Sequence, residues 1–369
     1  MGLALAGAAY QLVAAWQIRA LLVQPRVARQ ATAPAVTILK PLHGAEVGLD
    51  AALQSFLVQD YPGPVQIVFG VQDPADPAQL VVGSLRRAHP EGDVALVVEA
   101  APHGANRKIS NVINMMERAR HDIVVLADSD IVVRPDYLRQ VVAAIETPGV
   151  GVVTCPYRGL AVGGIWSRLA AMGLTYQFLP SVAVGVGFGL AHPCMGSTIA
   201  LRREVLTRIG GFETFADLLA DDYAIGAAVR ATGLRSLVAP VLVGHNCTEH
   251  SLAELTRHEL RWARTIRGVD PAGFFGSGVT HAVPLALLGI FFSGASLISL
   301  AVLAIALMCR LWLMREVDRI ADADRRGLWL APLRDVLSFV IFLGSFFVRA
   351  VDWRGTQFRV DAQGALRRI

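Results

Sequence analysis

Two carboxylates stand two residues apart at the end of a short apolar run. Asp128 and Asp130 flank Ser129 directly after the apolar residues 123–127. Such a pair can converge on one hard cation, because Mg²⁺ is typically held by one or two carboxylates together with phosphate oxygens. Without a cation the two acids would repel each other, and one would tend to stay protonated. We interpret the pair as a metal site that receives a diphosphate; a solvated acidic turn is the plainer alternative.

A second acidic pair opens a predicted helix. Asp221 and Asp222 begin a helical stretch that ends at Gly233, a residue suited to a helix C-terminus. Acidic side chains favour the first turn of a helix because they interact with its dipole, which explains one member of the pair. The other, Asp222, is a candidate general base that takes the proton from an attacking hydroxyl. The spacing alone leaves both interpretations open.

Further polar residues follow the predicted strands. Only two of the 34 basic residues are lysines, and both stand at such positions. Lys40 comes with Pro41 and His43 after the first predicted strand, Asp73 after the second, and Lys108 after the third. In an open α/β sheet, ligands bind beyond the carboxyl ends of the strands. These positions therefore predict a ligand-binding edge of the sheet where acids and bases face each other.

An arginine-rich helix is predicted from 252 to about 267. Ser251 and Glu254 form a capping box at its start. Arg257, Arg261 and Arg264 recur at helical spacing and share one face, and Trp262 follows Arg261. Such a face can clamp a diphosphate, since arginine makes bidentate phosphate contacts. It can equally lie on anionic lipid headgroups. We expect Arg261 to point inward and the other two to lie nearer the lipid.

The elements that must position these residues alternate along the chain. Continuous apolar strands that alternate with amphipathic helices indicate an α/β fold with a doubly wound, mostly parallel sheet. We expect one such domain over 35–275. The predicted strands are 36–39, 66–71, 94–100, 123–127 and 150–154, and the predicted helices are 49–59, 77–88, 109–120 and 135–146.

Composition excludes several classes of protein. Of 369 residues, 54% are apolar and 17% are charged, whereas a soluble globular chain carries about 25% charged residues. An ordinary cytosolic enzyme and a disordered chain are both excluded. The net charge of +4 is too small to indicate a nucleic-acid binder. The four cysteines are far apart and have no metal-ligand spacing, so neither a disulfide framework nor a zinc site is expected.

Three apolar blocks indicate a membrane protein. The first, 1–24, is nearly long enough to span a bilayer. The arginines that follow its uncharged part, Gly2 to Ile18, are Arg19, Arg26 and Arg29, and they favour a cytoplasmic location for the next domain. The second and third lie within 281–351 and are separated by a charged stretch, 310–326. We expect a hairpin of two short helices broken near Gly289 or Gly294, then one span, and a basic tail over 352–369. Residues 176–192 predict a buried hairpin or an entrance for an apolar substrate.

Seven stretches in this order resemble the GT-A glycosyltransferases of families 2 and 21. The resemblance covers nearly the whole chain and is closest to ceramide glucosyltransferases and to bacterial hopanoid-biosynthesis glycosyltransferases. It implies a bacterial inner-membrane, multi-pass enzyme with a cytoplasmic catalytic domain. The stretches are LKPLHG (39–44), QDYP (59–62), VQDPADP (71–77), NRKISN (106–111), DSD (128–130), ADDY (220–223) and HELRW (258–262).

The resemblance also implies roles for individual residues. Asp73 would contact the nucleotide, Asp128 the metal-bound diphosphate, and Asp222 would be the base. Arg261 and Trp262 would close over the leaving group. Position 258 departs from the pattern, because His258 stands where the family has Gln or Arg, which puts the role of this position in doubt. The further donor contacts implied are Lys40, Pro41, His43, Lys108 and Asn111, and the implied metal ligands are Asp128 and Asp130.

The function that follows is an inverting transfer from a UDP-sugar, with Mg²⁺ or Mn²⁺, to the hydroxyl of a membrane lipid. The resemblance to the hopanoid branch implies N-acetylglucosamine and bacteriohopanetetrol; glucose and ceramide are the alternative. A polysaccharide synthase would share the motifs but would need more membrane spans. A transporter would carry charges inside its apolar blocks, where only Arg334, Asp335 and Arg349 occur, near block ends. A silent sugar-nucleotide binder is disfavoured while all three acidic positions are filled.

Overall fold

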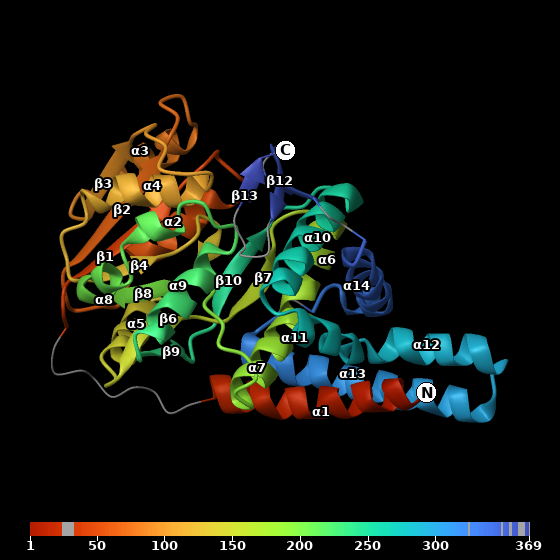
Figure 1. Ribbon diagram of the computed structural model, residues 1–369. Helices are drawn as coiled ribbons and strands as arrows, with labels where there is room; N and C mark the ends of the chain where they lie inside the picture. The colour runs from red at the N-terminus through yellow and green to blue at the C-terminus, as the bar shows by residue number, and fades with distance from the viewer. Residues whose placement is uncertain (24–32, 324, 348–349, 354–355, 361–365, 369) are drawn as a thin grey trace. The chain divides into compact units, whose positions relative to one another are not determined.

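The chain divides into two units, each assembled from segments that are distant in sequence (Figure 1). The computed structural model describes residues 1–23, 33–323, 325–347, 350–353, 356–360 and 366–368. The sheet unit comprises Pro25–Tyr157 and His192–Asn246, and the helical unit comprises Met1–Gln24, Arg158–Ala191 and Cys247–Ile369. Residues 158–191 and 247–275, which we predicted to belong to one domain with the sheet, therefore group with the helices.

A seven-stranded sheet organises the sheet unit, in the order β3-β2-β1-β4-β8-β6-β9. Strand β8 runs antiparallel to β4 and β6, and the other neighbours are parallel. A short antiparallel pair, β5 with β10, lies outside this sheet. The strands are β1 (Val36–Pro41), β2 (Val65–Val71), β3 (Asp93–Val98), β4 (Ile123–Leu126), β5 (Ile131–Val132), β6 (Val150–Thr154), β8 (Ile199–Arg202), β9 (Arg235–Val238) and β10 (Val243–Cys247).

Successive residues of the central strands enter two different cores. In β1, Ile38 belongs to one buried cluster and Leu39 to the other. In β4, Val125 and Leu126 divide in the same way. Both faces are therefore covered, which is why these strands are continuous apolar runs. The predicted α/β fold with a doubly wound, mostly parallel sheet is confirmed.

Helices of the sheet unit supply the apolar side chains of the two cores. Residues of α2, α3 and α5 contribute to the core that contains Ile38, and residues of α4, α8 and α9 to the core that contains Leu39. All five predicted strands and all four predicted helices are present within a few residues of the expected ends. The helices are α2 (Leu49–Leu57), α3 (Ala78–Ala88), α4 (Arg107–Met116), α5 (Tyr137–Ile145), α8 (Arg203–Arg208), the 3₁₀ turn η2 (Phe212–Phe215) and α9 (Asp221–Ala231).

The helical unit packs long apolar helices against one another. Small residues of α1, α12 and α13, including Ala4, Ala286 and Ala306, form a buried cluster. Its elements are α1 (Gly2–Leu22), β7 (Tyr157–Ala161, all but its first residue), α6 (Ile165–Gly173), the π-turn η1 (Leu174–Phe178), α7 (Leu179–Gly187), α10 (Leu252–Val269), α11 (Pro271–Gly276), η3 (Ser277–Thr280), α12 (Ala282–Ser293), α13 (Leu297–Ala321), η4 (Leu328–Leu330), α14 (Ala331–Ser345), β11 (Ala350–Trp353), β12 (Thr356–Val360) and β13 (Leu366–Arg368).

The predicted break in the second apolar block lies at Gly294. This glycine has a φ of 65°, which ends α12, and α13 begins three residues later. The expectation of two short helices is wrong for the second, because α13 has 25 residues and continues through much of the charged stretch 310–326. Ion pairs compensate these charges: Arg310 binds Asp335, and Glu316 binds Arg19.

Residues 176–187 are helical and do not form the predicted hairpin. The elements α6, η1 and α7 form a continuous run from Ile165 to Gly187. Its glycines serve close packing and not turns: a Cβ at Gly173 would stand 2.3 Å from the Arg334 guanidinium, and one at Gly187 would stand 2.0 Å from the Gln17 side chain. Sequence alone does not distinguish these two uses of glycine.

Three helices of the described residues are long and apolar enough to cross a membrane: Ile165–Gly187, Leu297–Ala321 and Leu328–Ser345. A bent pair, Pro271–Thr280 with Ala282–Ser293, would make a fourth span if it crosses as one. Helix α1 is not among them, and its role as an anchor stays a prediction. Arg26, Arg29 and Arg349, which we weighed in the sequence, lie outside the described residues.

Candidate active site

The exit of β1 brings Lys40 under the acidic loop that follows β4. Lys40 is fully buried, its Nζ donates to the backbone carbonyl of Asp128, and it lies 4.0 Å from the centre of the Phe56 ring. Burial lowers the pKa of Lys40 to about 7, although the charges of Asp130 and Asp128 oppose this shift. Lys40 therefore holds the loop by its backbone.

The loop after β1 is held by an aspartate that the sequence analysis did not single out. Pro41 ends the strand, and the Gly44 backbone N–H, at a φ of 74°, donates to both carboxylate oxygens of Asp76 at 3.0 Å. The exposed imidazole of His43 lies 3.5 Å from the same carboxylate. Asp76 is buried and also accepts from Ala78 N. His43 is thus presented to solvent at the carboxyl edge of the sheet.

Two predicted donor contacts follow β2 and open α4. Asp73 lies beyond the end of β2, where its Oδ1 accepts from Ala75 N at 2.8 Å in a local turn. Asn111 is only 3% exposed, and its side-chain amide donates to Gly70 O at 2.8 Å. This bond connects α4 to β2, and we therefore interpret Asn111 as a structural residue and not as a donor contact.

A lysine and two aspartates form the centre of the site. Lys108 Nζ lies 2.8 Å from Asp128 Oδ1 and 3.2 Å from Asp221 Oδ2. These residues come from the start of α4, the end of β4 and the start of α9, so three separate elements meet at one ammonium group. The structure thus brings together Lys108 and Asp128, which we expected at one edge of the sheet, with the Asp221–Asp222 pair, which we expected only at the start of a helix.

The two neighbouring aspartates of α9 have different partners. Asp221 is buried; it pairs with Lys108 and accepts from the Asn106 side chain at 3.2 Å. Asp222 accepts two backbone N–H groups, from Gly196 at 3.0 Å and from Tyr223 at 2.7 Å. Asp221 therefore acts as the counter-ion of Lys108, which leaves Asp222 as the candidate base.

Gly196 links Asp222 to Asp128. Besides its bond to Asp222, its carbonyl accepts from Asp128 N at 3.2 Å. A Cβ at this position would stand 2.6 Å from Asp128 Oδ2 and 3.2 Å from Lys108 Nζ. No motif marked this glycine in the sequence. The only available signal was its position in the segment before an unpredicted strand, β8.

The charges of the cluster shift one another's pKa values. Burial is the main cause that raises the pKa of Asp222 to about 6, and the negative charge of Asp221 adds to it. Burial alone would lower the pKa of Lys108, but Asp128, Asp221 and Asp222 outweigh this effect and raise it above its ordinary value. Lys108 is therefore a permanent cation, and Asp222 titrates near neutrality.

Asp128 and Asp130 supply a donor set that suits a hard divalent cation. Burial raises the pKa of Asp128, although the charge of Lys108 opposes this shift. The side chain is still 36% exposed, so a cation can reach its carboxylate. Asp130 Oδ2 lies 3.2 Å from His245 Nδ1. Two carboxylates plus substrate phosphates match the usual coordination of Mg²⁺. Among the described residues there is no group of three or more His, Cys, Asp or Glu placed to hold a metal.

The predicted residues Arg261 and Trp262 lie in the helical unit, on α10. Ser251 caps this helix by accepting from Glu254 N, as predicted. His258 Nδ1 lies 2.7 Å from Glu249 Oε1, and its ring centre is 4.2 Å from that of Trp262. The residue that departs from the family pattern is therefore held by a carboxylate and packs on the tryptophan.

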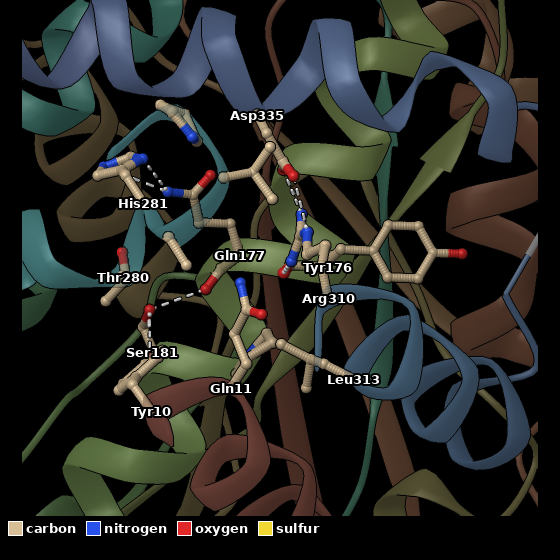
Figure 2. Close-up of a pocket in the computed structure, with 14 residues that line it drawn as sticks. Tyr10, Gln11, Tyr176, Gln177, Ser181, Thr280, His281, Arg310, Leu313 and Asp335 are labelled. Atoms are coloured by element: carbon tan, nitrogen blue, oxygen red, sulfur yellow. Dashed lines mark hydrogen bonds and ion pairs between the residues drawn. The ribbon is translucent and has the colours of Figure 1, made fainter. Parts of the chain in front are cut away.

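The helical unit also contains a buried polar centre, which Figure 2 shows. Arg310 of α13 makes a two-pronged ion pair with Asp335 of α14, at 3.0 and 2.6 Å, and also donates to Tyr176 O at 2.7 Å. Close by, the Gln177 side chain lies 3.3 Å from His281 Nδ1. The cavity among these residues has a volume of about 20 Å³, enough for one water molecule.

Comparisons with known proteins find similarity over nearly the whole chain. The profile of glycosyl transferase family 21 matches residues 1–366. Ceramide glucosyltransferase 1 of Caenorhabditis elegans is 22% identical over 365 residues, covering 91% of this chain and 74% of the relative. An N-acetylglucosaminyltransferase of Bradyrhizobium diazoefficiens is 24% identical over 240 residues, covering 63% of this chain and 49% of the relative.

Among solved structures, the mannosyltransferase PcManGT of Pyrobaculum calidifontis, in complex with GDP-Man and Mn²⁺, has a similar fold. Its TM-score is 0.50 at 21% sequence identity, and the match covers 93% of this chain and 97% of that chain. The similarity of fold therefore extends over both units and is not limited to the sheet unit.

Proposed function

Because the chain belongs to glycosyl transferase family 21, we propose that it transfers a sugar from a UDP-sugar to the hydroxyl of a membrane lipid, with inversion at the anomeric carbon. The observation that carries the proposal is the cluster of Lys108, Asp128 and Asp222 at the carboxyl edge of the sheet. The apolar helices of the same chain support a lipid as the acceptor. The sheet unit would then face the cytoplasm at a bacterial inner membrane.

Asp222 is the base in this proposal. Its carboxylate takes the proton from the acceptor hydroxyl, the acceptor oxygen forms a bond to the anomeric carbon, and the bond from that carbon to the diphosphate breaks with its electron pair. A pKa near 6 leaves Asp222 largely ionised at pH 7 and still basic enough to accept the proton. The Gly196 N–H holds Oδ2 in place, so the carboxylate is oriented before the acceptor arrives.

We propose that Lys108 and the metal site stabilise the negative charge on the leaving diphosphate. Asp128 and Asp130 would hold Mg²⁺ or Mn²⁺, which supplies positive charge for the diphosphate oxygens. Lys108 remains cationic at neutral pH, and its ammonium group lies 2.8 Å from Asp128 Oδ1, beside the proposed metal site. We further propose that Asp73 and His43 contact the nucleotide, and that Arg261 and Trp262 close over the leaving group.

The sugar and the lipid are the finer part of the proposal. The N-acetylglucosaminyltransferase relatives support N-acetylglucosamine with a hopanoid such as bacteriohopanetetrol as the acceptor. Ceramide glucosyltransferase relatives that match over nine-tenths of this chain favour the second candidate, UDP-glucose with ceramide. Both candidates use the same catalytic cluster.

A donor and acceptor matrix tests the proposal. Membranes that contain the protein are incubated with UDP-glucose or UDP-N-acetylglucosamine and with ceramide or extracted hopanoid, and lipid products are weighed by mass spectrometry. We expect one lipid species whose mass rises by one sugar residue, absent from membranes with Asp222→Asn. A ladder of masses would instead identify a polysaccharide synthase, and the absence of any sugar-bearing lipid would contradict the proposal.

A further inference from the structure

A cavity of about 400 Å³ in the helical unit is lined by three arginines. Arg158 comes from β7, Arg168 from α6, and Arg326 from the segment after α13. Among the described lining residues, the only acidic one is Asp322, and Arg158 donates to its backbone carbonyl. The volume falls in the range of small-ligand pockets, about 300–1,000 Å³. The cavity therefore carries an excess of positive charge and room for a ligand.

The walls of the cavity are closely built. A Cβ at Gly159 would stand 2.3 Å from Ala171 Cα, so β7 and α6 are in direct contact there. Gly159 N also donates to the Thr175 hydroxyl at 3.1 Å. Next to the wall, the Tyr176 hydroxyl donates to Asp318 Oδ1 at 2.5 Å. These contacts fix the position of β7 and α6 in the wall of the cavity.

Arg168 is the most informative of the three arginines. Its aliphatic stem packs beneath Gly327, where a Cβ would stand 2.5 Å from Arg168 Cδ. Its Nε is buried and has no hydrogen-bond acceptor among the described residues. A buried donor without an acceptor is costly, so this N–H points to an oxygen that belongs to a ligand.

The cavity lies where two candidate membrane spans end. The run Ile165–Gly187 begins beside it, and Leu297–Ala321 ends beside it. The lining residues of the first run extend from Arg168 to Tyr176, so the arginine end of the cavity lies near the ends of both candidate spans, and the rest reaches the middle of the first. As membrane spans, the two helices would place the arginine end near the polar boundary of the bilayer, the level of lipid phosphates. Its lining also includes Leu160, Ala161 and Met172, which offer apolar surface next to the arginines.

The polar centre in Figure 2 differs from the arginine cavity in how its arginine is bound and in its volume. There the guanidinium of Arg310 is fully engaged by Asp335 and by the Tyr176 carbonyl, and the cavity holds about 20 Å³. The arginine cavity has about 400 Å³ and a buried donor that still needs an acceptor. The first is a structural ion pair, whereas the second has the properties of a binding site.

We propose that the arginine cavity binds the phosphate of an anionic phospholipid. Arginine matches phosphate in a two-pronged geometry that lysine cannot reproduce. The adjacent apolar lining favours a lipid over free phosphate, because it would cover the glycerol and the first part of an acyl chain. The site is separate from the catalytic cluster, and its occupation does not depend on which sugar or acceptor the enzyme uses.

Lipid binding by the purified full-length protein tests this proposal. Native mass spectrometry measures retention of phosphatidylglycerol by the wild type, Arg168→Gln, Gly327→Ala and Arg315→Gln. Arg315 is an exposed arginine of α13 outside the cavity, and its variant is the charge-matched control. We expect one retained phosphatidylglycerol in the wild type and in Arg315→Gln. Affinity should fall about tenfold in Arg168→Gln, which loses charge-assisted hydrogen bonds.

Gly327→Ala keeps every charge and only displaces the Arg168 stem, so it answers the question even if Arg168→Gln does not fold. A parallel titration with inorganic phosphate separates the two phosphate sources. Retention of phosphatidylglycerol that inorganic phosphate does not displace supports the lipid site. Four outcomes would each overturn the proposal. Inorganic phosphate could displace the lipid, or the wild type could bind no lipid. The wild type, Arg168→Gln and Gly327→Ala could retain it equally, or Arg315→Gln could lose it as much as Arg168→Gln does.

Discussion

The backbone N–H of Gly196 donates to Oδ2 of Asp222 at 3.0 Å, while the carbonyl of the same glycine accepts from Asp128 N. One residue without a side chain therefore aligns the candidate base and the candidate metal ligand. A Cβ here would stand 2.6 Å from Asp128 Oδ2 and 3.2 Å from Lys108 Nζ, so the carboxylate of Asp128 would have to move.

Replacement of Gly196 by alanine should weaken donor binding. The new Cβ must displace Asp128 Oδ2, from which it would stand 2.6 Å away, and overpacking of this kind costs about 1–3 kcal/mol. We expect the affinity for UDP-sugar with Mn²⁺, measured by calorimetry, to fall about tenfold. Gly83→Ala is the matched control, since its Cβ would meet nothing closer than 3.7 Å. Equal affinities in the two variants would show that Gly196 does not shape the site.

Asp222→Asn should bind the donor and lose transfer. An amide has nearly the same shape but cannot accept the proton, and general-base catalysis contributes about 10²–10⁴-fold. We expect kcat to fall by that factor, while the Kd for UDP-sugar stays within about twofold of the wild type because Lys108 and Asp128 are intact. Asp136→Asn, an aspartate of the same unit outside the cluster, serves as the control. Near-wild-type turnover in Asp222→Asn would refute the base assignment.

Activity should rise with pH through about 6. Burial raises the pKa of Asp222 from its ordinary value to about 6, so the carboxyl remains protonated, and inactive as a base, to a higher pH than an exposed aspartate. Log kcat/KM should therefore climb with a slope near 1 below pH 6 and level off above it. A profile that is already flat at pH 5 would mean that Asp222 is not the group that limits transfer.

Transfer should depend on a metal ion that Asp128 helps to hold. We expect chelation to abolish transfer by the wild type and added Mn²⁺ or Mg²⁺ to restore it. Asp128→Ala should lose the metal-dependent part of donor binding, at least about tenfold, because one of two carboxylates is gone. Calorimetry with and without Mn²⁺ measures this part directly. If Asp128→Ala still gains affinity on addition of Mn²⁺, the metal binds elsewhere.

Asp335→Asn should destabilise the protein. Arg310 would remain buried with its ion-pair partner neutralised, and the removal of one partner of a buried pair costs about 3–5 kcal/mol. We expect a lower thermal midpoint in detergent, restored in part by Arg310→Met in the same chain. The control is Arg208→Gln, which breaks an exposed pair with Glu204. An unchanged midpoint in Asp335→Asn would show that the pair contributes little.

The sheet could be predicted because the residue composition of its strands indicates that both of its faces are buried. Ile38, Leu39, Val124 and Val125 are apolar without alternation, and only a sheet covered on both faces accommodates them. The strand β8 was missed because its neighbours in the sheet, β4 and β6, are distant in sequence and run antiparallel to it. The strand has only four residues, of which three are apolar, and it lies between a glycine-rich segment and a charged helix.

The candidate site was predictable as a set of acidic and basic residues but not as a network. Asp128 and Lys108 follow from residue type and their place after strands, and the Asp221–Asp222 pair follows from its place at the start of a predicted helix. Which of the two α9 aspartates pairs with Lys108 depends on side-chain geometry that spacing does not encode. Gly196 was missed because it acts through its own backbone groups, and Asp76 because its carboxylate accepts from backbone N–H groups; neither kind of contact leaves a pattern of residue types.

Asn106 gives the cluster a mechanical property. Its side-chain oxygen accepts from Ile109 N at the start of α4, and its amide donates to Leu218 O and Asp221 Oδ1 ahead of and within α9. Separation of α9 from α4 would break both amide bonds of Asn106 and the ion pair between Lys108 and Asp221 at once. The starts of the two helices are therefore tied together at the cluster, so a shift of α9 would change the positions of Asp221 and Asp222 relative to Lys108.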